Sequence, residues 1–165
     1  MSEPRLQGAG FLNFKFCMIY LASDHRGFEL KGKIKERLKD WGYEYEDMGA
    51  FEYDKDDDYP DFISKVAEMV ANDPERSRGI ILGGSGQGEA MAANRYKGVR
   101  AAVFYGFYPQ GSEDIIKLSR EHNDANILSL GASFIDEEAA MKAVKLWLET
   151  AFSGEERHVR RISKF

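Results

Sequence analysis

Five short apolar runs alternate along the chain with longer segments in which apolar residues recur at helical spacing. The apolar runs cover residues 16–22, 43–46, 79–82, 99–104 and 127–130. The helical segments cover about residues 28–41, 59–70, 87–94, 112–121 and 136–152. A strand that is followed by a helix and then by another strand is typical of parallel sheets, where the helix makes the crossover. The sequence therefore predicts an α/β fold, a doubly wound parallel sheet of five strands with helices on both faces.

The short second run and the apolar first run favour the strand order 2-1-3-4-5. In such a sheet, ligands bind outside the carboxyl ends of the strands at the point where the order reverses, here between the first and third strands. No linker or internal repeat interrupts residues 16–165, which are predicted to form a single domain. Residues 1–15 are interpreted as an N-terminal extension, and residues 153–165 as a basic C-terminal tail.

Composition excludes several classes of partner and cofactor. A net charge of −5 disfavours nucleic acid and anionic membranes, and no apolar run reaches the length of a membrane span. Cys17 is the only cysteine, so the chain cannot form an internal disulfide or a cysteine zinc site, and a cytoplasmic location is predicted. The acidic run Asp54–Asp58 lacks the glycine and the later glutamate of a calcium loop and is interpreted as a solvated loop. We expect neither a metal nor a cofactor.

The segments that follow the first and third runs should face one crevice. Ser23–Gly27 follows the first run, and Gly83–Glu89 follows the third. Residues 83–88 contain four glycines, which let backbone N–H groups approach an anion closely. The segment is neither a Walker loop nor a dinucleotide fingerprint, because their spaced residues are absent. A phosphate or oxyanion nest is favoured over the alternative, a flexible turn.

Glu89 directly follows the last glycine of this segment. An isolated carboxylate at the start of a helix is commonly only a partner of the helix dipole. Here, however, Glu89 is expected to share its crevice with Asp24, His25 and the glycine-rich nest. A carboxylate beside oxyanion donors is the arrangement that proton abstraction next to a carbonyl requires. Glu89 is therefore predicted to be a general base.

Five motifs along the chain resemble one known family. They are Ser23-Asp24-His25, Asp58-Tyr59-Pro60, Gly83–Asn94, Arg120–Asp124 and Arg157–Arg161. In this order they resemble the ribose-5-phosphate isomerase B family, which also includes the galactose-6-phosphate isomerase subunits. The resemblance covers roughly residues 18–165, and it implies the same doubly wound fold.

The resemblance also implies roles for individual residues. One branch of the family has a cysteine base at the position of Gly83, whereas this chain resembles the branch whose base is a glutamate at the position of Glu89. Asp24 would handle protons at the sugar oxygens, and His122 would assist ring opening. Ser85 and the amides near Gly84, Gly86 and Gly88 would form the anion hole. Asn123 would accompany His122, and both Asn123 and Tyr59 would bind the substrate. The residues that would contact its phosphate are His25, Arg157, His158 and Arg161.

In the family these groups converge from two subunits, which implies a homodimer or a dimer of dimers with shared active sites. Without the resemblance, the basic tail would be interpreted as a solvated end. Two departures leave the substrate open. Ser133 stands where many members have a phosphate-binding arginine, and residues 106–111 lengthen the segment after the fourth run. Ribose 5-phosphate is the predicted substrate, with a tetrulose phosphate or hexose 6-phosphate as alternatives. A non-catalytic sugar-phosphate sensor on the same fold is the alternative of another class.

Overall fold

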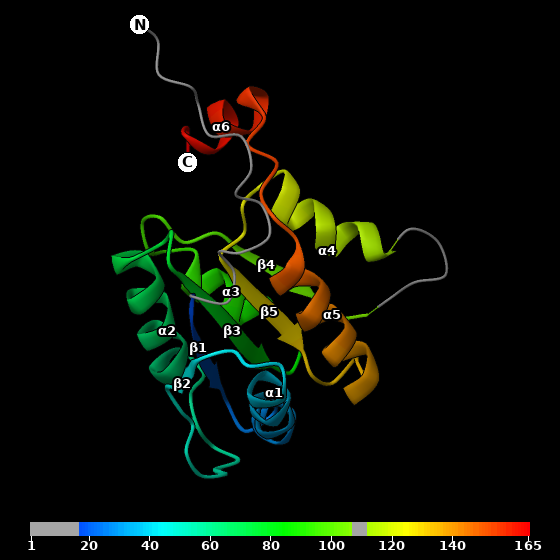
Figure 1. Ribbon diagram of the computed structural model, residues 1–165. Helices are drawn as coiled ribbons and strands as arrows, with labels where there is room; N and C mark the ends of the chain where they lie inside the picture. The colour runs from blue at the N-terminus through cyan, green and yellow to red at the C-terminus, as the bar shows by residue number, and fades with distance from the viewer. Residues whose placement is uncertain (1–16, 107–111) are drawn as a thin grey trace, which may run out of the picture.

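The computed structural model describes residues 17–106 and 112–165, apart from the side chains of residues 112–114 (Figure 1). Its strands are β1 (Met18–Ser23), β2 (Tyr45–Asp47), β3 (Ser77–Gly83), β4 (Ala101–Phe104) and β5 (Ile127–Gly131). Its helices are α1 (Phe28–Asp40), α2 (Pro60–Asn72), α3 (Gln87–Ala93), α4 (Ser112–Glu121), α5 (Glu137–Glu149) and α6 (Glu156–Ile162). The predicted alternation of strands and helices is confirmed from β1 to α5.

In the described part of the chain, the strands form one five-stranded parallel sheet in the order β2-β1-β3-β5-β4. The predicted order 2-1-3-4-5 is therefore wrong for the last two strands. Every residue of β5 is buried, whereas three of the four residues of β4 are partly exposed. A strand covered on both faces and paired on both edges belongs inside the sheet, and the shorter, more exposed strand lies at the edge.

Helices cover both faces of the sheet, as predicted. α1, α4 and α5 pack on one face through an apolar core that includes Leu38, Ile116 and Trp147. α2 and α3 pack on the other face, around Val66 and Ala93. Figure 1 shows α2 and α5 on opposite sides of the sheet. Because each strand runs in the same direction, all five carboxyl ends lie along one edge, where the loops that carry the predicted site begin.

The basic tail is more ordered than the sequence analysis indicated. Residues 156–162 form the helix α6, which lies beyond the amino ends of the strands (Figure 1). The amide of Ser153 donates to the carbonyl of Glu121 at 3.1 Å and so fixes the chain before α6 beside the end of α4. The predicted extension at residues 1–15 lies outside the described residues, as does the predicted insertion apart from Gly106. Among the described helices, none is long and apolar enough to cross a membrane.

Candidate active site

Asp24 lies immediately after β1 and is only 6% exposed. Its Oδ1 accepts the amide of Arg26 at 2.8 Å and the amide of Gly27 at 3.2 Å, which fixes the carboxylate at the start of α1. Within the described residues, the other oxygen, Oδ2, accepts no hydrogen bond. Asp24 thus keeps one free carboxylate oxygen at the carboxyl end of the sheet.

The glycine-rich segment after β3 turns sharply into α3. Gly86 has a φ of 76°, a left-handed conformation that favours glycine, and a side chain there would press on the backbone of Leu130. The hydroxyl of Ser129 donates to the carbonyl of Gly86 at 2.7 Å. Within the described residues, the amides of Ser85 and Gly86 donate to no acceptor. Two N–H groups are therefore available to an anion, as the sequence predicted for a nest.

Glu89 lies in the first turn of α3 and is 4% exposed. Burial raises the pKa of its carboxyl group above the ordinary value, and the charge of Asp24 raises it further. The amide of Glu89 itself opposes this shift by donating to the charged form. A carboxyl group whose pKa has moved toward neutrality is better matched to taking up and releasing a proton near pH 7.

The absence of a side chain at Gly83 leaves the space that the Glu89 carboxylate occupies. A Cβ atom at Gly83 would overlap Oε1 and Cδ of Glu89, because the side chain of Glu89 folds back over the end of β3. Gly88 is similarly restricted, since a Cβ atom there would lie 2.7 Å from the hydroxyl of Tyr59. At Gly83 and Gly88 the backbone is thus approached closely by two side chains, those of Glu89 and Tyr59, whereas at Gly86 the backbone conformation itself favours glycine.

His25 is held by Asp57, which belongs to the acidic run before α2. Nδ1 of His25 lies 2.6 Å from Oδ1 of Asp57, and the backbone amide of His25 donates to the same oxygen at 3.1 Å. The interpretation of residues 54–58 as a solvated loop therefore fails at Asp57, whose side chain is turned inward and is 6% exposed. Nothing in the spacing of the run distinguishes this acid from its neighbours.

A hollow of about 790 Å³ opens beside His25. Its other lining residues are Arg26, Phe28, Glu29, Tyr53, Lys55 and Ser133. The sequence analysis did not name Arg26. Its Cγ and the Oγ of Ser133 lie 3.7 Å and 3.6 Å from the position of a Cβ atom at Gly84. The aliphatic stem of Arg26 thus lies next to the nest, and the run Ser23-Asp24-His25-Arg26-Gly27 was the signal that could have found it.

The other predicted site residues gather elsewhere. The rings of His122 and His158 stack at 4.2 Å between centroids with an interplanar angle of 17°. His158 is 3% exposed, and its Nε2 is buried with no hydrogen bond within the described residues. Burial lowers the pKa of His158, and the neighbouring His122 lowers it further. Asn123, Arg157 and Arg161 are exposed in the same region.

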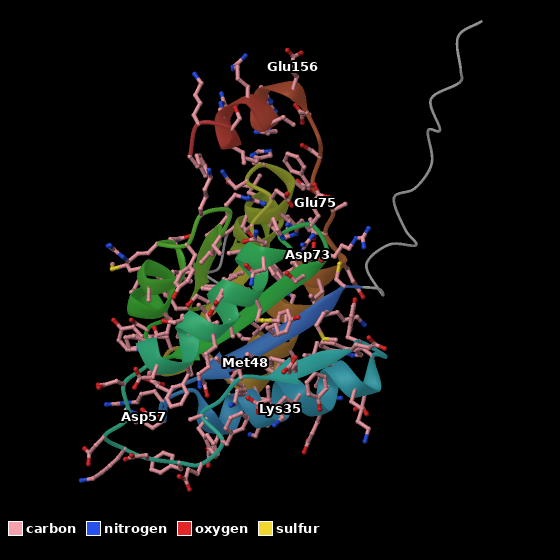
Figure 2. The ribbon with its side chains drawn as sticks, turned by 90° about the vertical axis from the view of Figure 1, so that its left-hand side faces the viewer. Lys35, Met48, Asp57, Asp73, Glu75 and Glu156 are labelled. Atoms are coloured by element: carbon pink, nitrogen blue, oxygen red, sulfur yellow. The ribbon has the colours of Figure 1, made fainter. Side chains whose placement is uncertain are left out.

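These residues form an amino-end group (His122, Asn123, Arg157, His158, Arg161). α4 ends just before β5 begins, and α6 follows α5, so both lie at the amino ends of the parallel strands. The carboxyl-end group (Asp24, His25, Tyr59, Gly84, Ser85, Gly86, Gly88, Glu89) lies at the other edge. Figure 2 labels Asp57, which contacts His25 of the carboxyl-end group, and Glu156, which lies in α6 with the amino-end group. The two residues lie at opposite ends of the molecule. A single chain therefore does not bring the predicted site together.

Residues 19–165 match a known family, described as Ribose/Galactose Isomerase. The chain belongs to this ribose/galactose isomerase family. The match spans every described strand and helix except the first residue of β1, and it includes both the carboxyl-end and the amino-end groups. The resemblance noted in the sequence is thereby confirmed at the level of the family.

Individual family members resemble the chain over most of its length. Ribose-5-phosphate isomerase B of Mycolicibacterium paratuberculosis is 42% identical over 144 residues, which are 87% of this chain and 86% of that protein. A crystal structure of ribose-5-phosphate isomerase B from Mycoplasma genitalium with bound ribulose-5-phosphate gives a TM-score of 0.83 at 39% identity, covering 89% of this chain and 92% of that one. The Clostridium thermocellum enzyme gives a TM-score of 0.80 at 42% identity, with 89% and 93% covered.

Proposed function

We propose that this protein is an aldose–ketose isomerase that interconverts ribose 5-phosphate and ribulose 5-phosphate, with Glu89 as the base. The observation that carries the proposal is the buried Glu89 carboxylate, which lies against Gly83 and whose pKa is raised by burial and by the charge of Asp24. The amides of Ser85 and Gly86, in the segment between Gly83 and Glu89, donate to no acceptor within the described residues. A binding protein has no need for a buried acid of raised pKa beside an anion nest. The family members with solved structures support the same reaction.

The reaction then needs only proton transfers. Glu89 takes the proton from the carbon next to the aldehyde, and the electron pair forms the double bond of an enediolate. The amides of Ser85 and Gly86 stabilise the negative oxygen. Asp24, through its free Oδ2, moves a proton from the hydroxyl oxygen on the second carbon to the former aldehyde oxygen on the first carbon. Glu89 then returns its proton to the terminal carbon, so that the ketose forms with no net gain or loss of atoms.

The site is completed by a second copy of the chain. In this proposal His122 of one chain assists ring opening in the site that contains Glu89 of the other, and Arg157, His158 and Arg161 contact the phosphate there. The opposite positions of the two groups in a single chain support this arrangement, since neither group can reach the other within one subunit. A twofold dimer, alone or within a tetramer, forms two such sites from two chains.

Mixing two inactive variants should restore activity if sites are shared. Glu89→Gln removes the base from the carboxyl-end group, and His122→Ala removes the ring-opening residue from the amino-end group. In a mixed dimer one site carries both changes and the other carries neither. After random exchange of subunits, we expect about half the molecules to be mixed and about one quarter of the sites to be intact. Activity of the mixture, measured against each variant alone, checks this.

Mixing Glu89→Gln with Asp24→Asn serves as the control, because both changes fall in the carboxyl-end group and every site keeps a defect. Equal activity in the two mixtures would contradict shared sites. So would a monomer in sedimentation experiments that turns over as fast as the assembled protein.

The choice of sugar is tested by a panel of four-, five- and six-carbon sugar phosphates in steady-state kinetics. Ribose 5-phosphate should have the highest kcat/KM, and the hexose and tetrulose phosphates are the competing outcomes. Arg26 supports a phosphorylated substrate, because this basic residue lines the same hollow as Ser133 and its stem lies next to the nest. Wash-in of solvent deuterium separates an isomerase from a sensor, since only removal of a carbon-bound proton produces it. A protein that binds the panel but exchanges no proton would contradict the proposal.

The proposal applies to residues 16–165 as one domain, which the family match at residues 19–165 supports. A cytoplasmic location and the separate status of residues 1–15 remain predictions from the sequence.

A further inference from the structure

We propose that Asp57 is a positioning residue that fixes the tautomer and orientation of His25, so that Nε2 of His25 is the ring atom presented to the sugar phosphate. The part that concerns the sugar phosphate rests on the proposed function. The part that concerns the ring does not. Neither the comparisons nor the motifs assign Asp57 a role.

The geometry is that of a carboxylate that grips one residue at two points. Oδ1 of Asp57 is 2.6 Å from Nδ1 of His25 and accepts the backbone amide of the same residue at 3.1 Å. The two residues are 32 positions apart, so the contact ties the loop before α2 to the loop after β1. A carboxylate accepts hydrogen bonds and cannot donate them, so Nδ1 must carry the proton.

The proton on Nδ1 decides what His25 offers to a ligand. With Nδ1 committed to Asp57, Nε2 is the nitrogen that remains for the hollow that His25 lines. A phosphate oxygen only accepts hydrogen bonds, so Nε2 must also carry a proton when it contacts the phosphate, and the Asp57 carboxylate then balances the charge of the ring. Tyr53 limits the tilt of the ring by an edge-on contact, 6.2 Å between centroids at 88°. Asp57 and Tyr53 both come from the segment between β2 and α2, so one segment sets both the rotation and the protonation of the imidazole.

The burial of Asp57 distinguishes it from the rest of the acidic run. Its side chain is 6% exposed, whereas that of Asp56 is 77% exposed. Oδ2 of Asp57 is buried and accepts no hydrogen bond within the described residues. A buried carboxylate oxygen without a partner costs stability, so this residue is held inward at a cost that its contact with His25 offsets only in part. Such groups are typical of functional sites.

The same atoms offer a competing arrangement. Asp24, His25 and Asp57 each place one possible ligand atom within 4.8 Å of the others, close enough for a divalent cation. The sequence predicted no metal, because it shows no histidine–carboxylate cluster with the spacing of metal ligands. A cation held there would draw on the Asp57 carboxylate that the proposal assigns to His25. The two arrangements differ in whether turnover needs the ion.

The test compares Asp57→Ala and Asp57→Asn with Asp56→Asn, a matched control that removes one negative charge from the exposed side of the same run. For Asp57→Ala, we expect KM for ribose 5-phosphate to rise roughly 10- to 100-fold, as for loss of a hydrogen bond to a charged group, with a much smaller change in kcat. Asp57→Asn keeps an oxygen that can accept from Nδ1 and should show a smaller rise. Asp56→Asn should match the unmodified protein.

The ring is observed directly by ¹⁵N NMR of His25 in the dimer without sugar phosphate and with EDTA. The unmodified protein and Asp56→Asn should show the proton on Nδ1, and Asp57→Ala should show a mixture of tautomers. An unchanged tautomer in Asp57→Ala overturns the proposal, even if the protein isomerises no sugar at all. Equal KM values for Asp57→Ala and Asp56→Asn in an active enzyme overturn it as well. Loss of turnover in EDTA, restored by a divalent ion such as Mn²⁺ or Zn²⁺ in the unmodified protein but not in Asp57→Asn, also overturns it and assigns these oxygens to a cation.

Discussion

Glu89→Gln is expected to abolish isomerisation while the protein keeps its fold and its affinity for the sugar phosphate. Glutamine retains the shape of the side chain but cannot accept a proton at neutral pH. Loss of a general base typically costs about 10²–10⁴-fold in rate, and an obligatory base costs more. Binding should survive, because the phosphate contacts are assigned to other residues, which are His25, Arg157, His158 and Arg161. Turnover, deuterium exchange and calorimetric binding of ribulose 5-phosphate check the three parts of this expectation.

The same substitution should stabilise the protein at neutral pH. The pKa of Glu89 is raised by burial in the folded state, so the protonated form favours folding. That contribution is complete below the ordinary value of 4.5 and is lost as the pH rises through the raised pKa. The glutamine of the Glu89→Gln variant is neutral at every pH, so it carries no such pH-dependent contribution. The melting temperature of Glu89→Gln should therefore exceed that of the unmodified protein above about pH 5, by a margin that grows as the pH rises through the raised pKa.

The competing interpretation of Glu89, a helix-start carboxylate without a catalytic role, predicts the opposite sign. Favourable interaction with the helix dipole contributes about 0.3–1 kcal/mol, which the substitution would remove. An active variant with a lower melting temperature would therefore contradict Glu89 as the base. The pH dependence of kcat/KM adds a further check, because activity should fall as the pH drops through the raised pKa of Glu89.

Gly83→Ala is expected to be nearly as damaging as the loss of Glu89 itself. The added methyl group would occupy the volume of the Glu89 carboxylate, and the side chain would have to leave its position over the end of β3. We expect turnover to fall by about 10²-fold or more and the free energy of unfolding to fall by about 1–3 kcal/mol, as in other overpacked interiors. Gly32→Ala is the control, because a Cβ atom there meets nothing within 4 Å.

A double-mutant cycle shows whether a side chain at position 83 and the side chain of Glu89 compete for the same volume. In a Glu89→Ala background the carboxylate is gone, so Gly83→Ala should destabilise the protein much less than it does alone. Activity should remain lost in the double variant. Additive changes in unfolding free energy would mean that the methyl group acts on something other than Glu89.

The parts of the structure that follow from local pattern could be predicted from the sequence. The segments after β1 and β3 lie next to each other, as expected, because they follow the two neighbouring strands where the order reverses. The positions of β4 and β5 could not be settled in this way. Both are short apolar runs, and only packing on two faces and two edges decides that β5 lies inside the sheet.

Other features depend on contacts between distant residues. Asp57 is one of several acids in a row, and no spacing rule shows that it alone turns toward His25. Helix α6 is rich in charged residues, so the sequence shows no clear apolar periodicity there. The packing of His158 against His122 appears only in the structure. The amino-end group was identified only through the family resemblance, because sequence order does not show at which edge of the sheet each motif lies.

The overlap between Gly83 and Glu89 also bears on how the two branches of the family can be related. A side chain at position 83 and a glutamate folded back from position 89 compete for one volume. With Glu89 as the proposed base, and a cysteine base in the other branch as the resemblance implies, a lineage that gained a cysteine at 83 first would displace its glutamate, and one that lost the glutamate first would have no base at all. Passage between the two chemistries therefore requires both changes within a short interval, or a duplicated gene in which one copy is released from selection.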